Sequence, residues 1–94
     1  MKRVRKKTVV VSQDLEEVKK KIGMKLKKKR KELGYTSYET FSYDISVNRT
    51  QYGKYEAGST DLQLSSLLKV VNAMGLTLEE FFSEDRESSM DTPR

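Results

Sequence analysis

The sequence contains no cysteine and no histidine. The lack of cysteine excludes disulfide bonds, thiolate chemistry and cysteine-based zinc sites, and the lack of histidine removes the commonest metal ligand and general base. The sequence also shows no clustered carboxylates, so no pattern offers a nucleophile together with a base. We therefore expect a protein that is not an enzyme and that uses neither a metal ion nor another cofactor.

Long apolar runs are missing as well. No stretch approaches the roughly 18 apolar residues of a membrane span. Residues 1–12 are basic but lack the longer apolar core of a secretory signal. A cytoplasmic protein without a membrane partner is therefore expected. The 94 residues, 35% of them apolar, suffice for one domain with a modest core, which fits a small all-helical unit.

Charge is distributed unevenly along the chain. Residues 1–34 contain 14 Lys or Arg and 4 Asp or Glu, a balance of +10, whereas residues 35–94 contain 5 and 10, a balance of −5. A basic terminal segment beside a helical unit is the usual electrostatic footprint of nucleic-acid binding. The same run of charge is also typical of a solvated helix face.

The N-terminal third divides into an arm and a helix. Residues 1–14 form a basic arm, in which Thr8 to Val11 predicts an edge strand or an ordered lead-in. Asp14 and Glu17 resemble a capping box, and the helix that follows ends at Gly34. Its apolar residues recur at spacings of three and four, at Leu15, Val18, Ile22 and Leu26. Its opposite face is basic and carries Lys19, Lys20, Lys21, Lys25, Lys27, Lys28 and Lys31.

Two short helices are predicted next. Thr36 or Ser37 caps the second helix, and Asn48 caps the third, which ends at Gly58. Two helices that cross over a short turn need a small residue where they come closest, and Ser42 supplies it. The apolar residues of the pair are Phe41, Ile45, Val47, Tyr52 and Tyr55. The same residues would also form the core of a mere helical hairpin.

The C-terminal part predicts a fourth and a fifth helix. Gly75 ends the fourth helix, and Thr77 with Glu80 forms a capping box for the fifth. The apolar stripe of the fourth helix consists of Leu64, Leu67, Leu68, Val71 and Met74, and the fifth helix presents Leu78, Phe81 and Phe82. Residues 83–94 are polar and acidic and predict a disordered tail.

The run IGMKLKKKRKELGYTSYETFSYDISVNRTQYGKYEAG, followed by LSSLLKVVNAMGLTLEEFF, resembles the DNA-binding domain of the Cro/repressor-like helix-turn-helix family, also called the XRE family. The likeness covers residues 22–82 and rests on the order of its features more than on any one motif. It implies an all-α, five-helix, lambda-repressor-like domain over residues 15–82. It also implies a sequence-specific transcriptional regulator, a repressor, that binds double-stranded DNA as a homodimer.

The third helix is the expected recognition helix. If Tyr52 and Tyr55 face inward, helix geometry turns the polar residues at positions 49–51, 53 and 54 outward or to the border. The resemblance implies that this face enters the major groove of an operator. The predicted base contacts are Arg49, Thr50, Gln51 and Lys54. The predicted contacts to the DNA backbone are Ser37, Tyr38, Asn48 and Gly53.

The resemblance also implies an ion pair between Arg30 and Glu56, which would tie the first helix to the end of the recognition helix. Ser46 departs from the family pattern, because it lies where a turn glycine is usual. Gly53 raises a separate question, since a glycine in a helix interior costs roughly 1 kcal/mol relative to alanine. Its missing side chain would let the backbone approach a duplex, or it would only relieve crowding between Tyr52 and Tyr55.

Other interpretations of these features stay open at this stage. Arg49 is otherwise an ordinary exposed charge in the first turn of a helix, and the basic arm either contacts DNA phosphates or is simply solvated. A second function class is an antitoxin-like or other protein-interaction module on the same fold, in which the arm or the acidic tail captures a protein such as a toxin.

Overall fold

The computed structural model describes residues 11–83. The described part contains the four helices α1 (Leu15–Glu32), α2 (Tyr38–Asp44), α3 (Arg49–Ala57) and α4 (Leu64–Ala73). Residues 78–83 are also helical, so the fold is all-α with five helices and no strand among the described residues. Most of the expected basic arm, including Thr8 to Val10, and the expected tail from residue 84 onward lie outside the described residues.

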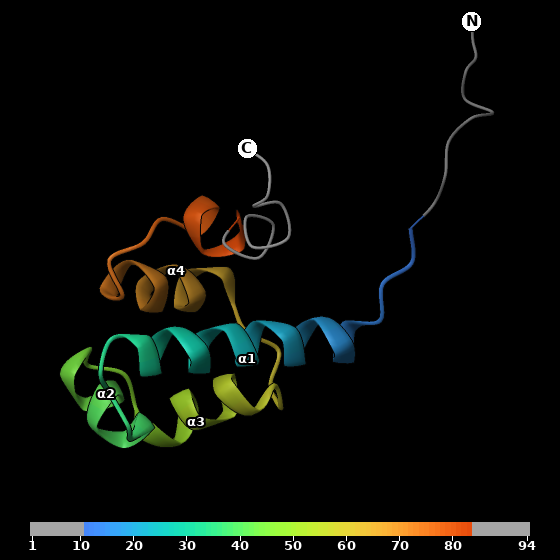
Figure 1. The fold of residues 1–94 in the computed structure, drawn as a ribbon. Helices are drawn as coiled ribbons and strands as arrows, with labels where there is room; N and C mark the ends of the chain where they lie inside the picture. The colour runs from blue at the N-terminus through green and yellow to red at the C-terminus, as the bar shows by residue number, and fades with distance from the viewer. Residues whose placement is uncertain (1–10, 84–94) are drawn as a thin grey trace, which may run out of the picture.

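Helix α1 runs through the middle of the fold (Figure 1). Helices α2 and α3 lie on one side of it, and α4 with the helical turn over residues 78–83 lies on the other. The core between these layers is made of side chains from every helix: Leu26, Phe41, Tyr52, Tyr55, Leu67, Val70, Val71, Met74 and Phe81. The predicted fold class is thus confirmed.

Most helix ends follow the predicted capping residues. The Ser37 hydroxyl accepts hydrogen bonds from the backbone N–H groups of the first turn of α2, and Asn48 Oδ1 accepts one from Gln51 N at 3.0 Å. The capping box of the last helix is complete, because Glu80 N donates to Thr77 Oγ1 at 3.0 Å and Thr77 N donates to Glu80 Oε1 at 2.9 Å. These side chains satisfy donors that a helix start leaves without partners.

The capping box predicted at the start of α1 is wrong. Asp14 is the N-cap residue, but its side chain makes no capping hydrogen bond. Leu15, predicted to be part of the apolar stripe, is exposed. Leu15 is the first residue of α1, and this end of the helix extends past the other helices of the described part of the chain (Figure 1). Helix α1 contributes apolar side chains to the core only from its second turn onward, through Leu26 and the partly buried Ile22.

The apolar stripe of α4 also differs from the prediction. Leu64 and Leu68 are 68% and 42% exposed, whereas Val70, which the prediction omitted, is buried. The buried set is Leu67, Val70, Val71 and Met74. Val70, Val71 and Met74 lie 3, 4 and 7 residues after Leu67, so the buried set lines one helix face just as the predicted set does. The leucine-rich sequence of α4 offers two overlapping stripes, and packing against the other helices selects one.

Candidate nucleic-acid interface

Helix α3, the expected recognition helix, is held by its inner face. Tyr52 and Tyr55 are buried, and their rings contact each other edge to face with centroids 6.1 Å apart. The ring of Phe41 from α2 packs on Tyr52 at 5.4 Å in the same manner. Because these aromatics face inward, α3 turns its polar side outward. All four predicted base-contacting residues, Arg49, Thr50, Gln51 and Lys54, are exposed.

The implied ion pair between Arg30 and Glu56 is present. Arg30 Nε donates to Glu56 Oε2 at 2.7 Å and Arg30 Nη2 donates to Glu56 Oε1 at 3.0 Å, which is a bidentate arrangement. The third nitrogen, Nη1, donates to the backbone carbonyl of Tyr35 at 2.8 Å. The side chains of Arg30 and Glu56 are only 4% and 7% exposed. One guanidinium therefore joins α1 to the end of α3 and to the loop before α2.

The hydroxyl of Tyr52 lies buried next to this pair and makes no hydrogen bond of good geometry. Burial, and then the nearby Glu56 carboxylate, raise the pKa of Tyr52 far above its ordinary value of 10. The hydrogen bond to Glu56 raises the pKa of Arg30 as well. The Arg30 guanidinium therefore stays charged and the Tyr52 hydroxyl stays protonated throughout the neutral range.

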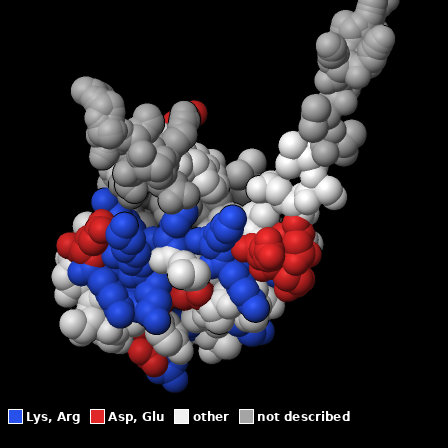
Figure 2. Space-filling view, turned by 45° about the vertical axis from the view of Figure 1, so that its right-hand side comes forward, with Lys and Arg blue, Asp and Glu red and all other residues white. Residues whose placement is uncertain are grey.

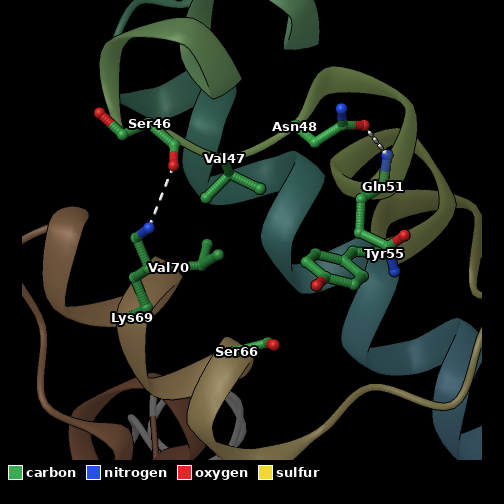
Figure 3. A pocket seen from close by; sticks show the side chains of 8 residues that line it. All are labelled: Ser46, Val47, Asn48, Gln51, Tyr55, Ser66, Lys69 and Val70. Carbon is green, nitrogen blue, oxygen red and sulfur yellow. Dashed lines mark hydrogen bonds between the residues drawn. The ribbon is translucent and has the colours of Figure 1, made fainter.

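The turn between α2 and α3 bends at Ser46, whose φ of 60° lies in the left-handed region. Val47 N donates to the carbonyl of Ser42 at 2.9 Å, and Ser42 is fully buried, as expected of the small residue between the two helices. From α4, Lys69 Nζ donates to the carbonyl of Ser46 at 3.0 Å (Figure 3). A serine in place of the usual glycine is thus accommodated with a positive φ and a contact from α4.

A shallow, open hollow of about 250 Å³ separates the start of α3 from α4 (Figure 3). Its lining mixes polar and apolar surface and consists of Ser46, Val47, Asn48, Gln51, Tyr55, Ser66, Lys69 and Val70. Sequence reasoning missed this hollow because its two walls come from helices distant in the chain. No periodicity within either helix indicates it.

Gly53 lies under the ring of Tyr38. A Cβ atom built on Gly53 would come 3.0 Å from Cε1 and 3.1 Å from Cζ of that ring. The expected crowding at this glycine is therefore real, and it comes from Tyr38 of α2, which the prediction did not consider. The contact also places the start of α2, with Ser37 and Tyr38, beside the middle of α3.

A second glycine, which sequence reasoning passed over, determines how closely α1 approaches α3. A Cβ atom on Gly23 would overlap the backbone carbonyl of Glu56 and come 2.7 Å from the carbonyl oxygen of Tyr55. Only a glycine allows α1 to lie this close to the end of α3. The sequence did contain a signal for this contact, namely a glycine inside a regular helical pattern. Such a glycine lowers helix stability, so a close contact elsewhere is expected to offset its cost.

In residues 11–83 no group of three carboxylates comes together in a way that would hold a metal ion. No helix in this part of the chain is both long and apolar enough to cross a membrane.

The comparisons with known proteins agree with this geometry. A family model described as helix-turn-helix matches residues 26–81, more than half of the chain. The control protein C.MunI from Mycoplasma sp is 39% identical over 70 residues, which cover 74% of this chain and 95% of that relative. The matched residues include α2, α3 and the turn between them. The chain therefore belongs to the Cro/repressor-like (XRE) helix-turn-helix family of DNA-binding proteins.

Proposed function

We propose that this protein is a sequence-specific transcriptional regulator, a repressor, that binds its operator by placing α3 in the major groove. The observation that carries the proposal is the division of α3 into a locked inner face and an exposed polar outer face. The family match supports it, and so does the name "control protein" of the relative that the chain covers almost completely. Both comparisons favour a regulator over an antitoxin-like or other protein-interaction module.

The proposed base contacts follow from the chemistry of the exposed side chains. Arg49 would donate two hydrogen bonds to O6 and N7 of a guanine, and Thr50 would contact a thymine methyl group or a polar base edge. Gln51 and Lys54 would reach bases or phosphates beside them. Each good bidentate contact contributes about 1 to 3 kcal/mol of discrimination against the wrong base.

The proposed backbone contacts surround α3. The Oδ1 atom of Asn48 is used to cap α3, which leaves its amide N–H groups to donate to a phosphate. The hydroxyl of Ser37 accepts hydrogen bonds from Glu39 N and Thr40 N and donates to Glu39 Oε1 at 2.9 Å. We therefore assign the phosphate contact at this place to the backbone N–H of Tyr38, which the cap does not use. Tyr38 and Gly53 lie against each other at the same place.

We further propose a homodimer, with the two α3 helices about 34 Å apart so that both enter the major groove on one side of the duplex. Phe82, in the last described helical turn, is the candidate contact, because the residue is 45% exposed although the adjacent Phe81 is buried. Replacing Phe82 with alanine should weaken dimers in sedimentation equilibrium. Replacing the equally aromatic but distant Tyr43, which is 83% exposed, should not. Equal effects of the two changes would count against this interface.

Selection of bound duplexes from a random pool tests the DNA function directly. We expect an enriched, approximately palindromic site, and an affinity for that site that falls steeply as salt is added, because bound lysines and arginines release counterions. A pool without enrichment, together with an affinity that does not respond to salt, would refute DNA recognition.

Two variants then separate base contacts from phosphate contacts. Arg49→Ala should cost about 1 to 3 kcal/mol on the selected site and relax the preference at one base pair in each half-site. A phosphate-contacting residue behaves differently, because its loss weakens binding to all sequences equally and lowers the salt dependence. Repeating the selection with Lys54→Gln shows which of the two kinds of contact Lys54 makes.

A further inference from the structure

The solvent face of α1 carries a cluster of lysines that the proposed function does not use. Met24 is 67% exposed at the centre of this face. Residues three and four positions away on a helix are its surface neighbours. All four of these positions are lysines, and Lys31 follows on the same side of the helix. We call this set the lysine face; its members, all exposed, are Lys20, Lys21, Lys27, Lys28 and Lys31.

Nothing on α1 neutralises the lysine face. No acidic residue occurs between Glu17 and Glu32. Two ion pairs between residues of α1 lie near its ends, where Lys19 pairs with Glu16 at 3.1 Å and Lys29 with Glu32 at 3.6 Å, and Arg30 pairs with Glu56 of α3. None of the five lysines of the face is paired with a carboxylate in the described part of the chain. Like charges three and four residues apart destabilise a helix, so this arrangement is unfavourable for the isolated fold.

The lysine face and the outer face of α3 belong to different sides of the molecule. Gly23 and Arg30 turn toward α3, and Tyr52 and Glu56 turn back toward α1. The two helices therefore present their exposed residues in different directions. Figure 2 shows lysine and arginine side chains gathered across the middle of the face it views, at the level of α1. A ligand on this surface is not the base pairs that α3 would read.

We propose that the lysine face binds the phosphate backbone of DNA that flanks the base pairs contacted by α3, so that the bound duplex continues along the side of α1. This inference rests on the proposed function. The dimensions fit, because the face extends from Lys20 to Lys31, eleven steps along the helix and about 16 Å at 1.5 Å per residue. Duplex DNA carries about nine phosphate charges over that length, at one per 1.7 Å.

Two other anionic partners fit less well. A membrane surface is bound by helices that insert an apolar face, but the apolar face of α1 is buried in the core through Leu26. An acidic protein segment would match the charge, but an evenly charged stripe along one helix is the footprint of a regular polyanion. The exposed side chain of Met24 does not change this preference, since lysine stems flank it on both sides.

Binding to duplexes of two lengths tests the inference. One duplex contains only the selected operator, roughly 20 base pairs or two helical turns, and the other adds roughly 10 base pairs on each side. The variant replaces Lys20, Lys21, Lys27 and Lys28 with glutamine, which is also a good helix former. The wild-type chain should bind the longer duplex about tenfold more tightly. The variant should lose this gain and depend less on salt, with a slope about 2 to 4 smaller on the longer duplex.

The matched control replaces the same four lysines with arginine, which keeps the charge and should keep the preference for the longer duplex. Circular dichroism of each variant checks that α1 is intact. Equal wild-type affinities for the two duplexes would overturn the inference. The inference would also be overturned if the glutamine variant kept its preference for the longer duplex but lost binding to poly-glutamate, a probe for an acidic protein partner. Failure of the wild-type chain to bind even the short duplex would instead refute the proposed function.

Discussion

The hydroxyl of Tyr52 is buried and has no good hydrogen-bond partner. Leaving such a group buried and unsatisfied costs roughly 1 to 3 kcal/mol, whereas removing it costs little. Tyr52→Phe should therefore raise the free energy of unfolding by about 1 kcal/mol, seen as a higher urea midpoint with an unchanged slope. The control is Tyr43→Phe at an exposed position. A lower midpoint for Tyr52→Phe would mean that the hydroxyl stabilises the Arg30–Glu56 pair.

The same hydroxyl makes stability depend on alkaline pH. Burial raises the pKa of Tyr52, and a 2.6 Å hydrogen bond to Asp44 raises the pKa of Tyr35, so the folded state holds protons that the unfolded chain releases above pH 10. The stabilisation is complete below pH 10 and is lost as the pH rises further. Tyr52→Phe should lose less stability than wild type between pH 10 and 11 in urea titrations. Parallel curves would contradict this assignment.

Gly53 and Tyr38 are coupled through the ring that lies over the glycine. A methyl group on Gly53 gains helix propensity, about 1 kcal/mol, but it would press on the Tyr38 ring at 3.0 Å. Gly53→Ala should therefore stabilise the chain in a Tyr38→Ala background by about 1 kcal/mol and clearly less in the wild type. Unfolding of the two single variants and the double variant in urea measures the coupling. Additive effects would show that the ring moves aside without cost.

At the level of whole elements, Gly23 determines the distance between α1 and α3. A side chain at position 23 would collide with backbone atoms of Tyr55 and Glu56, and these atoms cannot rotate aside as the Tyr38 ring can. Gly23→Ala should lower the free energy of unfolding by about 1 to 3 kcal/mol despite the gain in helix propensity, because the two helices must separate. Thermal unfolding alongside Gly53→Ala provides the comparison. A stabilised Gly23→Ala variant would mean that α1 shifts freely along α3.

Element boundaries followed from the sequence wherever a local side chain or glycine terminates the helix. Ser37, Asn48 and the Thr77–Glu80 box make their bonds within three residues, and Gly34, Gly58 and Gly75 adopt the positive φ that suits a glycine at a helix end. Which face of α4 is buried did not follow, because Leu64 and Val70 are both apolar and only core residues from the other helices decide between them.

At the scale of the whole molecule, the outward side of α3 was predictable because it is the complement of two inward tyrosines on one helix. The Lys69–Ser46 bond and the hollow between α3 and α4 were not, since they join segments 23 residues apart whose contact no local pattern encodes. The partner of Gly53 was missed for the same reason. Helical periodicity indicates which residues share a face but not which ring from another helix covers that face.

The Arg30–Glu56 pair connects α1, the end of α3 and the loop before α2, so its loss should affect both stability and DNA binding. Arg30→Met strands a buried carboxylate and Glu56→Gln strands a buried guanidinium, and each should cost about 3 to 5 kcal/mol. Replacing both partners with apolar residues, as Arg30→Met with Glu56→Leu, should recover most of that loss, because no charge is then left unpaired. Urea unfolding measures these changes.

Operator affinity of the refolded double variant then tests what the pair does beyond stability. If the guanidinium fixes the angle of α3 through its three hydrogen bonds, the double variant should be stable yet bind the selected operator at least tenfold more weakly, since apolar side chains do not reproduce that geometry. Wild-type affinity in a stable double variant would show that packing around Tyr52 and Gly23 alone positions the recognition helix.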